Sequence, residues 1–494
     1  MKKVKKLFIR VLSLTIAFLF VLGTTTGCDD DVSGVELITA NTKYETTQKG
    51  KPLPVYNLTY DALGGENVMP LGISWGPTDL NKESINGVEI PDFVDDKYYD
   101  LFSKAGINYV AWAINQKWNF NKLEIIEALE LCEKYGMGMY VADDYLMKTP
   151  KSEDEMRARL AEYKDYPAFL GLYGEDEPTV KRFADFTVIN ETYSKVIDAD
   201  KYPGYYNLFP NYATGTQLSG DENPIEYEEY VRRFADTGVK VLGYDYYPFS
   251  YKDQGTTDNI NNKIFTNLSI VKKVANEYQI PYRVLLQAGG QWEGNIFQPS
   301  DPYFPNEGET LWNINSTLAY GVKIIGYFCG IQPFEFSRTD TGEDYNRNSM
   351  IGTAGNINQW YYYIQKANKQ IQAAAPVLLH SANVGIVATA DTAAKIPEID
   401  RLSLPWRQLT GVIGVNASNS KSVAEGVMVG CFDYKGGTAL YVVNCSSLEK
   451  QKITLKFDKK YGMDVVQRAV SVGVAAKELT LTVEKGEGVL VALR

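Results

Sequence analysis

The sequence predicts a TIM barrel of the (α/β)8 class, followed by an all-β sandwich domain. Eight apolar runs recur between residues 68 and 329, and amphipathic segments with helical spacing separate them, as in repeated βα units. Beyond residue 377 the runs become short and alternate with polar residues, without helical periodicity between them. We therefore expect the barrel over residues 67–376 and the β-sandwich over residues 377–494.

The first 27 residues have the pattern of an export signal. They hold five cations and no acids, and an apolar run from Val11 to Leu22 precedes small residues and Cys28. This pattern resembles a bacterial lipoprotein cleavage site, which predicts a lipid on Cys28 and a polar tether over residues 28–66. The apolar run is short for a membrane span. We expect an exported protein at the bacterial cell surface that meets the membrane only through this lipid anchor.

The predicted barrel strands are nearly continuous apolar runs, as expected of parallel strands that are buried on both faces. Between them, Ser152 followed by Glu155 has the spacing of a helix capping box. The eight runs are Val68–Trp75, Ile107–Ala113, Met137–Ala142, Phe169–Gly174, Tyr202–Leu208, Val239–Asp245, Tyr282–Gln287 and Val322–Cys329.

The composition excludes several classes of site. His380 is the only histidine, so a zinc site built on a histidine pair is not possible, and we expect no metal and no cofactor. The net charge of −11 disfavours a nucleic-acid partner. The chain contains 35 tyrosines and 7 tryptophans, which suit a carbohydrate partner, and nothing indicates an obligate protein partner. Any chemistry must therefore depend on carboxylates, tyrosines and amides.

Three consecutive acids end the fourth predicted strand, in the sequence Gly171-Leu-Tyr-Gly-Glu-Asp-Glu-Pro178. The carboxyl ends of barrel strands are where catalytic residues lie. Repulsion among Glu175, Asp176 and Glu177 should raise at least one pKa, which is what a general acid near neutral pH needs. A solvated acidic loop is the alternative interpretation. We take Glu177 as the proton donor.

Other polar and aromatic residues are predicted to converge on the same rim, because each lies at or just after a strand end. Among the acids, Asp245 has the best position for a second catalytic carboxylate, although a purely structural role is equally compatible with the sequence. The residues expected to bind substrate are Trp75, Asp143, Tyr173, Asp176, Asn207, Tyr244, Gln287, Trp292 and Gln332.

Residues 68–375 resemble the barrels of clan A glycoside hydrolases, and most closely the family 42-like hydrolases of bacterial surface lipoproteins. The resemblance rests on the fourth strand quoted above, on Gly243-Tyr-Asp-Tyr-Tyr-Pro248 and on Gly326-Tyr-Phe-Cys-Gly330. It implies that Glu177 is the proton donor, with Asp176 where the clan has asparagine. It also implies a glutamate nucleophile at the end of the seventh strand, where this chain has Gln287.

An amide cannot form a glycosyl ester, so Gln287 leaves the second carboxylate open among Asp245, Glu293 and Glu335. The first hypothesis is an exported glycoside hydrolase that cleaves O-glycosidic bonds of a poly- or oligosaccharide. The second is a surface protein that binds glycan on a degenerate glycosidase barrel without cutting it.

Overall fold

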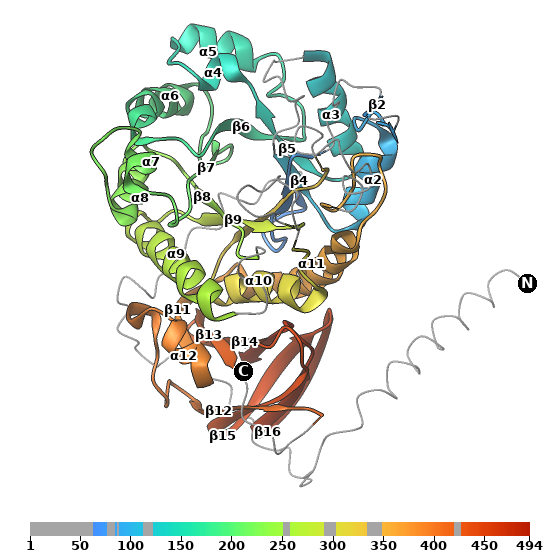
Figure 1. The fold of residues 1–494 in the computed structure, drawn as a ribbon, viewed down its shortest axis with the longest axis vertical. Coiled ribbons are helices and arrows are strands. Elements are labelled where there is room, and N and C mark those ends of the chain that lie inside the picture. Colours follow the sequence, from blue (N-terminus) through green and yellow to red (C-terminus); the bar gives the residue numbers. More distant parts are fainter. Residues whose placement is uncertain are drawn as a thin grey trace, which may run out of the picture.

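The computed structural model describes residues 63–76, 84–85, 88–111, 122–249, 257–290, 303–332, 348–418 and 426–494. It contains a parallel barrel surrounded by helices and an antiparallel all-β domain packed beneath helices α9, α10 and α11 (Figure 1). The fold class predicted from the sequence is thereby confirmed. Over the described part of the chain, no helix combines the length and hydrophobicity needed to cross a membrane. Residues 28–62 of the predicted tether, Cys28 included, lie outside the described residues, whereas residues 63–66 are described and Leu63 is buried in the core.

The barrel sheet has eight parallel strands in the order β7-β6-β5-β4-β1-β10-β9-β8. Each of the eight predicted apolar runs supplies one strand, because both faces of these strands are buried. Their bounds are β1 Leu71–Ser74, β4 Tyr109–Ala111, β5 Gly138–Ala142, β6 Phe169–Asp176, β7 Tyr205–Asn207, β8 Leu242–Tyr246, β9 Tyr282–Gln287 and β10 Ile324–Phe328. A separate short hairpin joins β2 Ser84–Ile85 and β3 Val88–Glu89.

The barrel closes between β7 and β8 through little backbone pairing. A single bridge joins Leu208 to Tyr244, and the Leu208 N–H donates to the Gly243 carbonyl at 2.8 Å. The buried Arg283 guanidinium of β9 also donates to the Tyr206 carbonyl. A side chain at Gly243 would collide with Arg283, since a Cβ there would lie 2.3 Å from Nη2. Side chains therefore complete the closure of the barrel at this seam.

Helices surround the barrel, and α5 begins where its capping signal indicates. Ser152 caps α5 and Glu155 completes the capping box, as the sequence predicted. The helices are α2 Asp96–Lys104, α3 Lys122–Lys134, α4 Asp144–Met147, α5 Glu153–Leu160, α6 Phe183–Val196, α7 Gly215–Ser219, α8 Tyr227–Ala235, α9 Thr257–Tyr278, α10 Glu307–Ala319 and α11 Gln359–Leu378, with the 3-10 turn η4 Val180–Arg182.

The all-β domain has its strands in the order β11-β13-β14-β17-β15-β12, and β16 pairs with β15. A short helix, α12, lies between β11 and β12, where the alternating pattern predicted no helix. The domain's elements are β11 Ser381–Ala388, α12 Ala390–Lys395, the 3-10 turn η8 Glu398–Asp400, β12 Leu409–Asn416, β13 Val427–Tyr434, β14 Gly437–Asn444, β15 Gln451–Gln467, β16 Val470–Val483 and β17 Gly488–Leu493.

The faces of β13 serve two cores. Met428 and Phe432 belong to the core shared with the barrel, whereas Val429 and Cys431 belong to the domain's own core. Helix α10 lies between the barrel and the β domain, and all of its residues after Glu307 are buried. At Gly308 of α10 a Cβ would lie 2.1 Å from the Ser447 carbonyl oxygen, so only glycine allows this approach.

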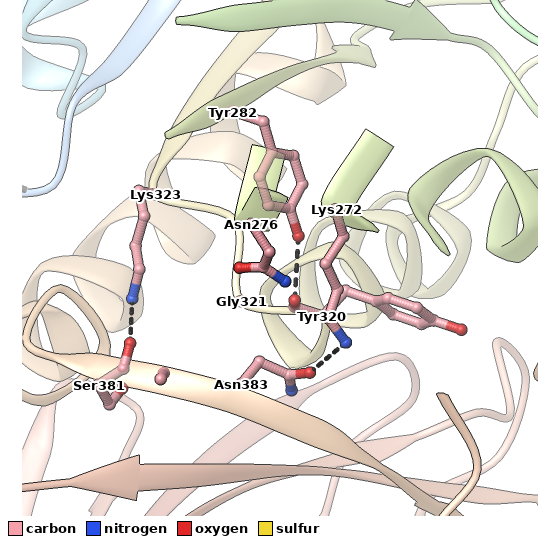
Figure 2. Close-up of a pocket in the computed structure, with 9 residues that line it drawn as sticks. Lys272, Asn276, Tyr282, Tyr320, Gly321, Lys323, Ser381 and Asn383 are labelled. Carbon is pink, nitrogen blue, oxygen red and sulfur yellow. Dashed lines mark hydrogen bonds between the residues drawn. The ribbon is translucent and has the colours of Figure 1, made fainter. Parts of the chain in front are cut away.

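Figure 2 shows a polar cavity at the same junction. The Lys323 ammonium donates to the Ser381 carbonyl at 2.6 Å and to the Leu378 carbonyl at the end of α11. The Lys272 ammonium donates to Asn383 Oδ1 at 2.6 Å and pairs with the carboxylate of Asp400 at 2.9 Å. Buried polar contacts therefore accompany the apolar packing between the barrel and the β domain.

Candidate active site

The three acids at the end of β6 have different surroundings. Glu175 forms an ion pair with Arg182 of η4, with Nε and Oε2 3.0 Å apart. Asp176 accepts a hydrogen bond from Asn207 Nδ2 at 2.9 Å. Glu177 has a φ of +47°, and its N–H donates to the Asn207 carbonyl at 2.7 Å. The pairing of β6 with β7 shifts register between Tyr173 and Asp176, so simple alternation does not set the direction of these side chains.

Asn207 joins two carboxylates across the seam between β7 and β8. Its Nδ2 donates to Asp176 Oδ1 and to Asp245 Oδ1, each at 2.9 Å. Asn207 is 2% exposed and Asp245 is 5% exposed. Three neighbouring strand ends, β6, β7 and β8, therefore bring Asp176, Asn207 and Asp245 together, as predicted from their positions at strand ends.

The pKa values of these acids are raised. Burial, and then the neighbouring Asp176, raise the pKa of Glu177 to about 7. Burial raises the pKa of Asp245 well above its ordinary value; the charges of Glu177 and Asp176 add to this, and the Asn207 amide opposes it. Asp176 is exposed to solvent as a residue. Even so, partial burial of its carboxyl group among the surrounding protein atoms raises its pKa as well. Burial therefore disfavours the ionised form of each of these acids.

One predicted cause of the raised pKa of Glu177 was wrong. We expected Glu175 to contribute to the repulsion that keeps Glu177 protonated, but its carboxylate is paired with Arg182. The carboxylate that acts on Glu177 at this strand end is Asp176, and burial contributes more than repulsion does.

Aromatic rings line the rim beside the acids. Trp75 and Phe328, at the ends of β1 and β10, pack edge to face with centroids 5.0 Å apart, and Tyr247 stacks on Phe328 at 5.2 Å. Tyr212, after β7, packs against Tyr246 at 5.7 Å. Of these rings, only Trp75 was predicted as a site residue; Tyr212, Tyr247 and Phe328 were not, although each lies at a strand end or soon after one.

Tyr173 lies below the rim rather than on it. Its ring stacks on Tyr205 with centroids 5.1 Å apart, and only 3% of the residue is exposed. The Arg283 guanidinium lies 3.2 Å from the Tyr205 ring centroid on the same interior layer. Tyr173 therefore forms part of the barrel interior beneath the acids, where stacking supports the site.

Asp143 and Tyr244 lie outside the cluster. Asp143 is fully buried and caps α4, and its Oδ2 accepts hydrogen bonds from Arg159 Nε at 2.7 Å and from the Tyr163 hydroxyl at 2.9 Å. Tyr244 precedes Asp245 on β8, so its side chain occupies the opposite face of the strand, and it is fully buried. Both residues support the fold rather than the mouth of the barrel.

Two of the predicted amides form hydrogen bonds within the protein, Gln287 with the backbone and Gln332 with a side chain. Gln287 Nε2 donates to the carbonyls of Phe249 at 2.9 Å and Gly289 at 3.0 Å, and its Oε1 accepts from the Phe249 N–H at 3.0 Å. Gln332 is 1% exposed, and its Oε1 accepts from the Ser349 hydroxyl at 3.0 Å. Gln287 therefore fixes the loop that follows β8 through the backbone of Phe249.

Trp292, Glu293 and Glu335 lie outside the described residues. Within the described ranges, no three histidine, cysteine or acidic side chains are grouped so that they could hold a metal ion.

A glutamate at position 287 should destabilise the protein without creating a nucleophile. The carboxylate of Gln287→Glu would face the two carbonyl oxygens that now accept from Nε2, with no donor to offer them. A buried charge without partners typically costs about 3 kcal/mol. We expect a lower melting temperature and no gain in hydrolysis, and Gln365→Glu is the matched control because that amide donates to the Lys104 carbonyl near the surface. An increase in activity would contradict the structural role of Gln287.

No family model matches the chain, and no curated protein matches it in sequence. Among solved structures, a β-galactosidase from Bacillus circulans sp. alkalophilus is 9% identical, with a TM-score of 0.48 over 86% of this chain and 99% of that one. A glycoside hydrolase of family 5 from Bacteroides vulgatus is 12% identical, with a TM-score of 0.45 over 86% of this chain and 88% of that one.

A β-galactosidase from the psychrophilic Marinomonas ef1 is 10% identical, with a TM-score of 0.42 over 62% of this chain. The match spans only 60% of the length of that enzyme. These three solved proteins are glycoside hydrolases by name, and what this chain shares with them is a resemblance of fold.

Proposed function

We propose that the protein is an exported glycoside hydrolase that cleaves O-glycosidic bonds of a poly- or oligosaccharide. The observation that carries the proposal is the pair of acids, Glu177 and Asp245, at the mouth of the barrel, where burial raises the pKa of both and the charge of Glu177 raises that of Asp245 further. Cleavage of a glycosidic bond needs two carboxyl groups, one of which is protonated at the working pH. Lipid anchoring through Cys28 at the cell surface belongs to the same proposal.

The surroundings of the two acids favour different roles. Asp245 accepts an N–H from Asn207, and this hydrogen bond favours the ionised form of Asp245. Glu177 has only influences that raise its pKa. Burial raises the pKa of both acids, and the Asn207 amide distinguishes them. We assign the transferred proton to Glu177, which delivers it to the leaving oxygen as the bond to the anomeric carbon breaks. Asp245 is the second carboxylate, which supports the positive charge that develops on the sugar ring.

The pH dependence of the rate tests this assignment. Glu177 must be protonated, so kcat/KM should fall as the pH rises through about 7. Asp176→Asn removes the neighbouring negative charge, lowers the pKa of Glu177, and should move this limb of the profile to lower pH. The measurement is kcat/KM between pH 5 and 9 on a glycoside found by a broad screen with the wild type. A limb that does not move would contradict the coupling of Asp176 to Glu177.

A glycan-binding protein without activity is the second candidate, and Gln287 favours it. In clan A glycoside hydrolases, which the barrel resembles, this strand end carries the glutamate nucleophile. Here it carries Gln287, whose amide exchanges hydrogen bonds with the Phe249 backbone. If the wild type binds glycans in affinity electrophoresis but cuts none in the screen, this second function replaces the first.

A further inference from the structure

Tyr212 is an exposed aromatic residue beside the acids. It is 47% exposed, and it contacts Tyr246, the neighbour of Asp245, edge to face. Burial of its hydroxyl raises the pKa of Tyr212, and the charges of Asp245 and Glu177 add to this. Nearly half of the surface of this residue is nevertheless open to solvent beside the candidate catalytic pair.

The loop that carries Tyr212 is anchored on both sides of the ring. The Asn211 N–H donates to Asn267 Oδ1 at 2.7 Å, and Asn211 Nδ2 donates to the Lys263 carbonyl at 3.0 Å, so the loop is tied to α9. A turn follows, in which the Ala213 N–H donates to the Pro210 carbonyl at 3.0 Å. The exposed ring is therefore presented by fixed backbone, which lowers the entropy cost of binding against it.

A second aromatic face lies across the mouth. In the strand order β1 is four places from β7, which makes the two strands opposite in a closed ring of eight. Trp75 follows β1 and Phe328 ends β10, and both side chains are partly exposed. Tyr247 stacks on the Phe328 ring and fixes it. The acids on β6 and β8 thus lie between an aromatic face at Tyr212 and another at Trp75 and Phe328.

We propose that these two faces are sugar platforms on either side of the acids, so that the substrate is an oligosaccharide or polysaccharide with sugars bound on both sides of the cleaved bond. This rests on the proposed function. An exposed aromatic ring can cover the apolar face of a pyranose ring, and fixed aromatic anchors contribute much of the affinity of such sites. A single platform would bind one sugar ring. Two opposed platforms would bind sugar rings on both sides of the cleaved glycosidic bond.

The test compares Tyr212→Ala and Trp75→Ala on two kinds of substrate. The first is a series of oligosaccharides, two to six sugars long, from the polysaccharide that the wild type cleaves. The second is the glycosyl fluoride of the same sugar, which has one sugar ring and no sugar in the leaving group. We expect each variant to lose about tenfold in kcat/KM on the oligosaccharides, and at most one of them to lose activity on the fluoride.

Conservative variants and a distant tyrosine provide the controls. Tyr212→Phe keeps the ring, so its loss of kcat/KM on the oligosaccharides should be smaller than that of Tyr212→Ala. Tyr362→Ala removes another exposed tyrosine, 57% exposed on α11, and should change neither substrate. Equal melting temperatures of the variants would show that they fold.

Two results would overturn the inference while leaving the proposed function intact. One is a variant, of either residue, that cleaves oligosaccharides as well as the wild type; the other is loss of fluoride hydrolysis in both variants. If the wild type cuts neither substrate, the proposed function fails instead. The same variants are then compared for affinity to the oligosaccharides, and unchanged affinity in either one rejects the two-platform arrangement.

Discussion

Glu177→Gln should lower the rate of hydrolysis of ordinary glycosides by about 10²–10⁴-fold. The amide has nearly the shape of the carboxylic acid, and the backbone contact of residue 177 with the Asn207 carbonyl does not depend on the side chain. What disappears is the proton that Glu177 holds near neutral pH. Glycan affinity should remain close to that of the wild type. The measurement is kcat and KM on the best glycoside of the screen, with affinity determined separately.

Glu175→Gln is the matched control, because it alters the acid two positions earlier, whose partner is Arg182. It should leave kcat nearly unchanged. An aryl glycoside with an activated leaving group needs no proton donor and should partly rescue Glu177→Gln. Equal losses in both variants, or no rescue, would mean that Glu177 is not the proton donor.

The stability of the same variant provides an independent check on its folding. The pKa of Glu177 rises on folding, so the ionised side chain disfavours the folded state, and this penalty is fully present above pH 7. Glutamine has no charge to bury. The melting temperature of Glu177→Gln at pH 8 should therefore equal or exceed that of the wild type.

Asp245→Asn should be nearly as damaging, with a loss of about 10²–10⁴-fold on ordinary glycosides. The Oδ1 of an asparagine can still accept from Asn207 Nδ2, so the seam between β7 and β8 keeps its side-chain contact. The negative charge that supports the developing positive charge of the sugar is lost. An activated aryl glycoside should not rescue this variant, because the missing group does not act on the leaving oxygen. The rates on both substrates provide the measurement.

Asp143→Asn is the comparison that separates a structural acid from a chemical one. Asp143 is equally buried at a strand end, but it caps α4 and binds Arg159 and Tyr163. Its replacement should lower the melting temperature and leave kcat close to that of the wild type. If Asp245→Asn behaves in the same way, Asp245 is structural and the second carboxylate lies elsewhere on the rim.

The barrel could be predicted from the sequence because each parallel strand is buried on both faces and therefore appears as an apolar run. The capping box at Ser152 and Glu155 also acts locally, so its residues identify the start of α5 directly. The gathering of Asp176, Asn207 and Asp245 followed from one rule, that the carboxyl ends of parallel strands meet at one rim.

The position and the contacts of individual side chains could not be predicted in the same way. Asp143 and Asp245 both follow apolar runs, and only the three-dimensional positions of Arg159 and Tyr163 show that Asp143 serves the fold. The structural role of Gln287 depends on the path of the loop after β8, which brings the Phe249 backbone within hydrogen-bond distance of the Gln287 amide. Tyr212 was missed because its exposure depends on how its loop is tied to α9, which leaves no sequence pattern.

Helix α10 makes the two parts of the chain inseparable. One side of this helix serves the barrel and the other meets β13, β14 and β17, while the Tyr441 hydroxyl of β14 donates to Asn315 Oδ1 at 2.6 Å. A barrel released from the β domain would present this apolar face to water. The β domain is thus not an exchangeable module attached to a self-sufficient barrel.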